Sequence, residues 1–417
     1  MSIVVFEDSS CDALAPISTG RLVATILCGG WRLVDLVASL GEPAIAISRP
    51  YLRDILAADC DKLRLDCSGG EQQSAKPPRL MLSARAIPSQ GNAAALRQLL
   101  DSPADGPKIV YDRDTVAAIV DPPWTVSQLL SGGYEDLPGR LQEAKRFQTI
   151  DSPLQTFELP HEVVAANMRI INDNLQFRIG SQSYTQRQDG VFVAGKSKIG
   201  EYCLFDTASG PIVIEENVSI GPYTMLRGPI HIGANSKVLE HSSIKDYVSA
   251  GHTTKLGGEV EASVVEPYTN KQHHGFLGHS YLGSWINLGA GTCNSDLKNT
   301  YGMVNMEYPV GKAATGMQFL GCIMGDYSKT AINTGIFTGK VVGVCSMMYG
   351  FVTSNVPSFV NYARLFGQVA AIPPEVMIAT QGRVFARRNV TQRPIDVQLL
   401  HDMYALTRGE RAAYGDL

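Results

Sequence analysis

Residues 212–249 read IVIEENVSIGPYTMLRGPIHIGANSKVLEHSSIKDYVS and carry an aliphatic residue at every sixth position. These aliphatic positions are Ile214, Ile220, Leu226, Ile232, Val238 and Ile244. The fifth residue of each hexad is small or β-branched: Val218, Thr224, Ile230, Ser236, Ser242 and Val248. Neither the period of a helix, about 3.6 residues, nor the alternation of an ordinary strand fills all of these positions. A fixed six-residue repeat predicts a parallel β-helix, in which stacked coils bury the aliphatic side chains.

The composition of the whole chain predicts a soluble, cytoplasmic protein of two or three domains. It has 417 residues, of which 44% are hydrophobic, and a formal charge of −4, too small to indicate nucleic acid or a membrane surface as partner. Its eight cysteines include no C-x-x-C pair, which favours a reducing compartment. No apolar run reaches the roughly 18 residues of a membrane span, and MSIVVFEDSS does not resemble a secretion signal.

The N-terminal part alternates short apolar runs with helical patterns, which predicts an α/β domain with a largely parallel sheet. Strands are expected at 2–6, 44–48, 80–84, 108–111 and 117–120, helices at 22–40 and 92–100, and surface loops at 68–76 and 101–106. A helical segment at 160–174 is expected to link this domain to the coils.

Coils are predicted from about residue 198 to 350, with two interruptions. Residues 250–276 are too polar and irregular for plain coils, and a polar loop is expected at 294–300. Loops that leave a rigid repeat often carry function. Beyond the repeat, helices at 373–388 and 395–405 are expected to cap the last coil.

Six of the eight histidines lie between residues 231 and 279, in and beside the irregular stretch. Packing is the preferred interpretation for His231 and His241. The adjacent His273 and His274 lie in a polar segment and cannot both be core, and a neutral histidine suits general-base catalysis of attack on a thioester. Nearby Arg227, Lys255 and Lys271 are expected to point outward, where cations could hold a phosphate or be solvated surface charges.

The same region resembles a known family. GPYTMLRGP (221–229), NKQHHGFLGHSYLGSWINLGAGT (270–292) and NSDLKNTYG (294–302) are similar to the acetyltransferase half of bacterial glucosamine-1-phosphate acetyltransferase / N-acetylglucosamine-1-phosphate uridyltransferase, in its divergent sugar nucleotidyltransferase branch. The resemblance implies a left-handed β-helix and a homotrimer with active sites between neighbouring β-helices. It also implies acetyl-CoA as donor and an amino-sugar phosphate as acceptor.

Aligned through the shared L-G…N-[IL]-G-A-G-T pattern, the resemblance implies a role for individual residues. His273 falls at the catalytic base, Phe276 at a sugar-contacting tyrosine and Ala290 at a coenzyme A contact. Asn287 and Arg227 match substrate-binding positions, and an insertion around 250–268 leaves Lys255 as the candidate phosphate-binding lysine. Lys271 is a further substrate-binding candidate. Because Phe276 lacks the tyrosine hydroxyl, the acceptor could differ from glucosamine-1-phosphate.

The N-terminus resembles the same divergent branch through FED (6–8), LAPISTGR (14–21) and LCGG (27–30). The resemblance implies transfer of a nucleotidyl group from a nucleoside triphosphate with Mg²⁺, for which Asp8 and Arg21 are the candidate residues. Leu27 stands where the branch has an arginine, and the glycine-rich pyrophosphorylase loop is absent. Because phosphoryl chemistry needs cations, we expect weak or no nucleotidyl transfer.

The predicted organisation is an α/β nucleotidyltransferase-like domain (1–158), a helical linker (159–195), a β-helix acyltransferase domain (196–356) and a helical tail (357–417). Two other functions remain open. One is a metal hydratase resembling γ-type carbonic anhydrases, with His274, His279 and either His241 or His252 as ligands. The other is a non-catalytic subunit of the same architecture, used for assembly or regulation.

Overall fold

The computed structural model describes residues 2–63 and 75–413, and most of the loop predicted at 68–76 lies outside them. The chain divides into two compact units. The first comprises residues 1–14, 21–26 and 31–158; the second comprises 15–20, 27–30 and 159–417. Two short segments near the N-terminus therefore belong to the second unit.

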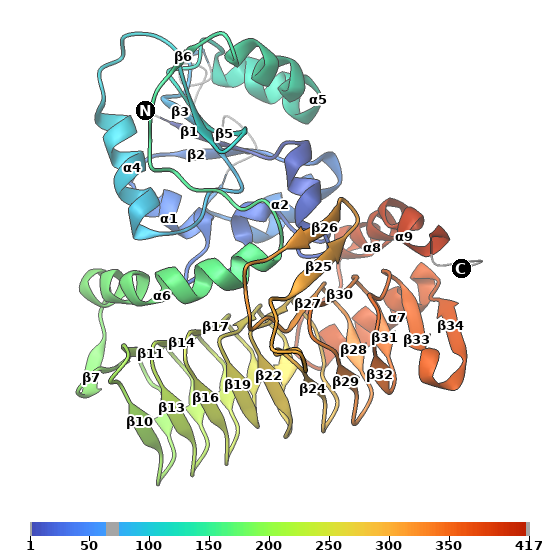
Figure 1. Cartoon of the computed structure of the whole chain (residues 1–417). Helices are drawn as coiled ribbons and strands as arrows, with labels where there is room; N and C mark the ends of the chain where they lie inside the picture. The colour runs from blue at the N-terminus through green and yellow to red at the C-terminus, as the bar shows by residue number, and fades with distance from the viewer. Residues whose placement is uncertain (1, 64–74, 414–417) are drawn as a thin grey trace. The chain divides into compact units, whose positions relative to one another are not determined.

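The first unit is built on a six-stranded sheet with strand order β2-β1-β3-β5-β4-β6 (Figure 1). Its strands are β1 (Ile3–Phe6), β2 (Ala44–Ile47), β3 (Leu80–Ser83), β4 (Lys108–Asp112), β5 (Thr115–Val120) and β6 (Gln148–Thr149). The registers show that β5 alone among these six runs against the others, so the predicted largely parallel sheet is confirmed. The chain continues from β1 to β2 on one side of β1, whereas β3 lies on the other side of β1. Open α/β sheets bind ligands where the strand order reverses in this way, which here is the boundary between β1 and β3.

The helices of the first unit agree with the prediction only in part. Its helices are α1 (Leu33–Ser39), α2 (Arg53–Asp59), α4 (Gln90–Asp101) and α5 (Val126–Ala144), with short 3₁₀ turns η1 (Ser9–Leu14), η2 (Val23–Thr25) and η3 (Pro50–Leu52). Of these, α2 and α5 were not predicted. The helix at 92–100 is confirmed as α4. The single helix predicted at 22–40 is wrong, because residues 27–30 leave the first unit and only η2 and α1 remain on either side.

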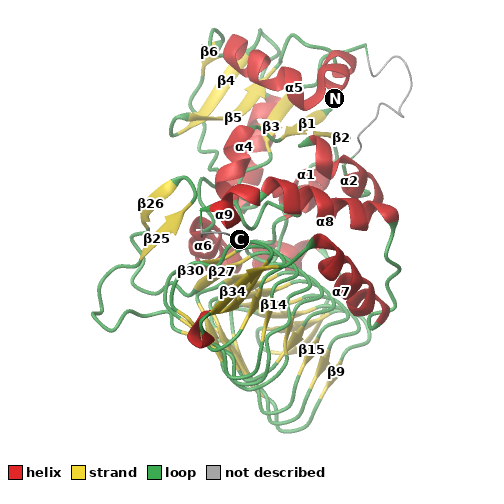
Figure 2. Cartoon of the chain, turned by 90° about the vertical axis from the view of Figure 1, so that its right-hand side faces the viewer, coloured by secondary structure: helices red, strands yellow, loops and turns green. Residues whose placement is uncertain are grey.

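The second unit is a β-solenoid of three-sided coils, preceded by helix α6 (His161–Ser181) and the hairpin of β7 (Thr185–Gln188) and β8 (Val191–Val193) (Figures 1 and 2). We name its three faces by what lies on them. The α6 face contains β8, β11 (Ile212–Ile214), β14 (Ile230–Ile232), β17 (Val248–Ala250), β20 (Val264–Val265), β23 (Tyr281–Leu282), β27 (Cys322–Met324) and β30 (Lys340–Val342). Ile171 and Leu175 of α6 pack on Val213 of this face.

The other two faces are made of equally short parallel strands. The α7 face contains β9 (Lys198–Ile199), β12 (Ser219–Ile220), β15 (Lys237–Val238), β18 (Lys255–Leu256), β21 (Asn270–Lys271), β28 (Lys329–Thr330), β31 (Met347–Met348) and β33 (Val360–Ala363). The third face contains β10 (Leu204–Asp206), β13 (Met225–Arg227), β16 (Ser243–Lys245), β19 (Glu259–Glu261), β22 (Phe276–Gly278), β24 (Cys293–Asn294), β29 (Gly335–Ile336) and β32 (Phe351–Val352).

The hexad register is confirmed. Ile212 pairs with Ile230 and Ile230 with Val248, so these coils are 18 residues long and comprise three hexads each. All six leading aliphatic residues are at most 2% exposed, and all six fifth-position residues are buried as well. Burying each large aliphatic side chain stabilises the fold by roughly 1.5–3 kcal/mol. The first coil begins at β8, earlier than the predicted Lys198.

The predicted interruption at 250–276 is wrong. These residues form regular coils that are shortened: Ser249 pairs with Val264, 15 residues later, and Val264 pairs with Tyr281. The repeat is hidden because Lys271 takes the inward position below Val238 and Leu256. The residues that leave the scaffold are 295–321, which contain the hairpin of β25 (Asn305–Tyr308) and β26 (Gly311–Ala314).

The tail helices are α7 (Pro374–Ala386), α8 (Pro394–Leu406) and α9 (Arg408–Ala412), preceded by the 3₁₀ turn η4 (Arg364–Phe366) and β34 (Gln368–Ala371). Only part of the expected capping occurs. Arg411 of α9 lies over the ring of Phe359 in the last coils. In contrast, α7 lies along the side of the coil stack (Figure 2), where Phe385 packs on Trp285 with 4.4 Å between ring centroids.

Candidate active site

The predicted catalytic residue, His273, lies at one corner of the solenoid. We call the turn between the α7 face and the third face the His273 corner; in successive coils it contains His241, Gly258, His274 and Gly291. His273 is exposed there, and its Nε2 atom lies 2.9 Å from the side-chain amide nitrogen (Nε2) of Gln272. The amide of Gly291 donates to the carbonyl of His274 over 3.1 Å, which joins the two coils at this corner.

Three other candidates lie close to His273 in the fold. Ala290 is in the same corner one coil further on, and Asn287 is exposed on the α7 face just before it. Phe276 begins β22 on the third face, and its ring covers Gly278, where an added Cβ would meet the ring at 2.3 Å. His273, Phe276, Asn287 and Ala290 therefore belong to two adjacent coils, which stack about 4.8 Å apart.

Arg227 does not join this group within one chain. It lies on β13, and β16 and β19 separate that strand from β22 on the third face, which corresponds to roughly 14 Å at the spacing of stacked strands. Its guanidinium forms an ion pair with Asp246, with Nε donating to Oδ1 over 2.8 Å. The residues around 250–268 that look inserted in the sequence form an additional, shortened coil, and this coil lies between Arg227 and His273.

Of the other two candidate cations, only Lys255 points outward as predicted. Lys271 does not point outward: it is 2% exposed, and its Nζ atom donates to the carbonyls of Gly257 (2.8 Å) and His273 (2.7 Å). Burial lowers the pKa of Lys271 to about 8. Lys255 does point outward, on the α7 face, because its neighbour Leu256 is in the core.

Two features of the site were missed by sequence reasoning. Cys293 is exposed at the start of β24, and its sulfur accepts a hydrogen bond of 3.3 Å from the amide of Phe276. Lys245 pairs with Arg227 in register and lies one coil nearer to Phe276, bridging Glu259 (2.8 Å) and Glu261 (3.1 Å). Lys245 follows Arg227 by 18 residues, the length of one coil, and this spacing is the sequence signal from which the position of Lys245 could have been predicted.

The histidines proposed as metal ligands do not converge within one chain. His274 lies at the His273 corner, His252 at the turn between the α6 and α7 faces, and His279 at the turn between the third and α6 faces. The Nδ1 atom of His279 contacts Asp296 at 2.8 Å, and the described part of the chain contains no group of three residues suited to hold a metal ion. His231 packs against Glu215 at 3.1 Å, whereas His241 is exposed and stacks on Tyr223, so the packing prediction is right for the first and wrong for the second.

In the first unit, the carboxyl ends of β1 and β2 are joined by a buried ion pair. Glu7 is fully buried and its carboxylate accepts from Arg49 Nε (3.1 Å), Arg49 Nη2 (3.0 Å) and the amide of Val23 (2.9 Å). The half-buried Asp8 caps the next turn by accepting from the amide of Ser10. Mg²⁺ is usually bound by one or two carboxylates together with substrate phosphates. Asp8 fits that role, whereas the oxygens of Glu7 are already occupied.

A buried arginine in the same unit was not singled out by the sequence. Arg85 follows β3 and is 1% exposed; its Nη1 atom donates to the carbonyl of Phe157 over 2.8 Å. Its Nε and Nη2 atoms have no hydrogen-bond partner among the described residues. Burying a charge without a counter-charge is costly, so Arg85 is a further candidate for binding an anion at the β1/β3 boundary.

The LCGG segment has a structural role in the second unit. The amide of Gly29 donates to Asn167 of α6 (2.8 Å) and that of Gly30 to Ser249 of β17 (3.0 Å). Leu27 is buried, and its amide donates to Glu266 over 2.8 Å. Position 27 thus packs on the solenoid, and leucine in place of arginine there no longer argues against phosphate binding.

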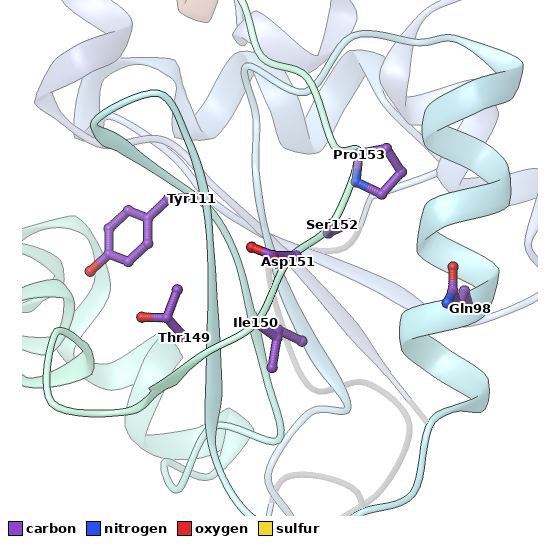
Figure 3. Close-up of a pocket in the computed structure, with 7 residues that line it drawn as sticks. All are labelled: Gln98, Tyr111, Thr149, Ile150, Asp151, Ser152 and Pro153. Carbon is purple, nitrogen blue, oxygen red and sulfur yellow. The ribbon is translucent and has the colours of Figure 1, made fainter.

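A surface pocket of about 330 Å³ lies in the first unit beside β4, β6 and α4 (Figure 3). It is lined by Gln98, Tyr111, Thr149, Ile150, Asp151, Ser152 and Pro153. The sheet order puts it at the edge opposite to β1 and β2, and none of the candidate residues lines it.

Comparison with known proteins agrees with the two-part organisation. Residues 3–182 match the sugar nucleotidyl transferase family and residues 211–258 match the bacterial transferase hexapeptide family. No helix in the described ranges is long and apolar enough to cross a membrane.

Among curated proteins, the chain is 27% identical over 179 residues to a bifunctional sugar-1-phosphate nucleotidylyltransferase/acetyltransferase of Sulfurisphaera tokodaii, covering 42% of this chain and 40% of the relative. It is 32% identical over 127 residues to the bifunctional protein GlmU of Thermodesulfovibrio yellowstonii, covering 28% of each. For GlmU of Acidithiobacillus ferrooxidans the identity is 24% over 295 residues, covering 64% and 60%.

These matches span less than two thirds of the relatives' lengths. A solved UDP-N-acetylglucosamine acyltransferase of Francisella novicida aligns with a TM-score of 0.26 at 17% identity, covering 54% of this chain and 77% of that one. The chain is thus similar to GlmU-like bifunctional transferases, and its match to the sugar nucleotidyl transferase family lies ahead of its match to the hexapeptide family.

Proposed function

We propose that the solenoid transfers an acetyl group from acetyl-CoA to the amine of an amino-sugar phosphate, with His273 as general base. The observation that supports this most is the gathering of His273, Phe276, Asn287 and Ala290 on two adjacent coils. The homology to bifunctional nucleotidylyltransferase/acetyltransferases supports the same reaction class.

The chemistry requires the attacking amine to lose a proton as the tetrahedral intermediate forms and collapses. An exposed neutral imidazole can accept that proton. Acetyl-CoA supplies the activated thioester carbonyl, and the small Ala290 side chain leaves the corner open for it. Phe276 offers an apolar ring beside the sugar, and Asn287 offers an amide that can hydrogen-bond a sugar hydroxyl.

The base assignment also has support from the backbone. The carbonyl of His273 accepts from buried Lys271, whose Nζ atom is itself tied to Gly257 of the preceding coil. This contact fixes the main chain of the corner while the imidazole stays exposed. Lys271 therefore acts as a positioning residue for His273 and does not bind substrate directly.

The acceptor is expected to differ from glucosamine-1-phosphate in the contacts it uses. Phe276 lacks a hydroxyl. The third face beside it presents Glu259 and Glu261, which both form ion pairs with Lys245. Carboxylates there favour an amine-bearing substrate and disfavour a phosphate on that side. The phosphate would then lie toward Lys255 and Asn287 on the α7 face.

The test is release of free thiol from acetyl-CoA in the presence of a panel of amino-sugar 1-phosphates. Acceptor-dependent thiol release that is lost in His273→Ala supports the proposal. His241→Ala is the matched control, because His241 is exposed at the same corner in an earlier coil. Acetyl-CoA binding without turnover of any acceptor would favour a non-catalytic subunit instead.

For the first unit we propose sugar-1-phosphate nucleotidyl transfer that is weak or absent. The missing glycine-rich loop and the full occupancy of the Glu7 carboxylate support this proposal. Asp8, Arg21 and Arg85 are the residues through which any such activity would act.

A further inference from the structure

The α7 face carries a cluster of cations, of which only Lys255 is used by the acyl transfer proposed above. Lys237 and Lys255 are register partners on adjacent coils, and both point outward because Val238 and Leu256 fill the core positions beside them. Arg387 and Arg388 follow the C-terminus of α7. We call these four residues the α7 cation cluster.

Arg388 is held beside the two lysines, at the level of the next coil. Lys255 pairs in register with Asn270 of the next coil, and the Arg388 Nη2 atom donates to the Asn270 side-chain oxygen. Successive coils thus present Lys237, Lys255 and then the guanidinium of Arg388. At about 4.8 Å per coil, all three charges fall within the reach of one or two phosphate groups.

The cluster has no acidic partner among the described residues. Lys237, Lys255, Arg387 and Arg388 take part in none of the ion pairs formed by those residues, whereas Lys245 on the third face bridges two glutamates. Burial, followed by the charges of Arg388, Lys237 and Arg387, lowers the pKa of Lys255. Burial and then Arg387 lower the pKa of Arg388.

A purely structural explanation covers only part of this arrangement. A helix C-terminus attracts cations, which accounts for Arg387 and Arg388 after α7. It does not account for two lysines on adjacent coils of the solenoid below them. Like charges held together cost free energy unless an anion compensates them, so the arrangement indicates a ligand.

We propose that the α7 cation cluster binds the phosphate groups of a small phosphorylated molecule, such as a nucleotide or a sugar phosphate. Arg388 supplies a planar fork that can donate two hydrogen bonds to phosphate oxygens, and Lys237 and Lys255 supply point charges. Asn270 holds Arg388 in place as a positioning residue. Asn270 pairs with Asn287 of the following coil, so the cation cluster adjoins the His273 corner.

The experiment is titration calorimetry of the full chain with inorganic pyrophosphate at low salt, followed by adenosine diphosphate and glucose-1-phosphate. Arg388→Gln and Lys255→Gln should each weaken pyrophosphate binding about tenfold or more, in line with the loss of a charge-assisted hydrogen bond. Arg383→Gln is the matched control, because Arg383 is an exposed arginine on the same helix. Tighter binding of adenosine diphosphate than of glucose-1-phosphate would identify a nucleotide as the ligand; the reverse order would identify a sugar phosphate.

A second readout separates binding from a structural role. Because the cations repel one another, Lys255→Gln without ligand should keep or raise the melting temperature while reducing the stabilisation by pyrophosphate. Pyrophosphate binding that is unchanged in both variants, or equally weakened in Arg383→Gln, would overturn the proposal. His273→Ala should bind pyrophosphate like the wild type, so failure of the acyl-transfer proposal would not be confused with failure of this one.

Discussion

The backbone amide of Leu27 donates a 2.8 Å hydrogen bond to the buried carboxylate of Glu266, at the turn that follows β20. The same carboxylate oxygen accepts from the hydroxyl of Tyr281 over 2.7 Å. A segment that resembles part of a nucleotidyltransferase motif is therefore also an integral part of the solenoid unit. Residues 27–30 and the coils belong to one compact unit.

This contact gives a stability prediction. Glu266→Ala removes the acceptor of two buried hydrogen bonds, and the loss of each costs about 1–3 kcal/mol. Glu266→Gln keeps an acceptor oxygen and should cost less. Urea unfolding of both variants measures this, with the exposed Glu216→Ala as control. Equal stability of Glu266→Ala and the control would contradict the assigned role of Glu266.

The register of the coils is tested at Ile232, which is fully buried. Ile232→Asp places an unpaired charge in the core of the stack, so the solenoid should fail to fold. Circular dichroism and solubility report the outcome. Lys237→Asp, an exposed substitution in the same coil, should remain folded. A soluble, native-like Ile232→Asp protein would refute the register.

Lys271 predicts an unusual pH dependence. Burial lowers its pKa to about 8 from 10.5, so between these values the unfolded chain binds a proton that the folded chain has released. Stability contributed by this group must then rise with pH, by up to ~3 kcal/mol over the full interval. The wild type should become more stable relative to Lys271→Met between pH 8 and 9.5. Lys237→Met, which changes an exposed lysine, should show no such trend.

Some of these features could be read from the sequence and others could not. The leading aliphatic residues fixed the inward positions of 212–249, because every coil there has the same 18-residue length. The coils at 250–276 were missed because they are shorter and place Lys271 at an inward position. A pattern search counts lysine as polar, whereas the fold satisfies its ammonium with two carbonyl groups.

The parts of the site that depend on contacts between distant residues were also beyond sequence reasoning. Alignment matched Arg227 to a substrate-binding position. Only the strand order of the third face shows that Arg227 lies three strands away from Phe276. Likewise, nothing local in LCGG indicates that Asn167 and Ser249 bind it. His273, Asn287 and Ala290 lie on two adjacent coils because they are about one coil length apart in the sequence.

Nucleotidyl transfer by the first unit is predicted to be weak or absent. The measurement is Mg²⁺-dependent pyrophosphate release from nucleoside triphosphates with sugar 1-phosphates. If robust release occurs, the prediction is wrong, and Asp8→Asn and Arg21→Ala should then abolish it. Arg85→Gln would show whether the buried guanidinium takes part, with melting temperature as the check on folding.

The most direct test of the account is the turnover of His273→Ala in the acetyl-transfer assay. Loss of a general base typically lowers the rate ~100- to 10,000-fold, so turnover should fall at least ~100-fold with acetyl-CoA binding nearly intact. His274→Ala should cost far less, and His279→Ala should act through loss of its contact with Asp296. If His273→Ala retains wild-type turnover, or if all three variants lose activity and release a bound metal, the assignment of His273 as the base is contradicted.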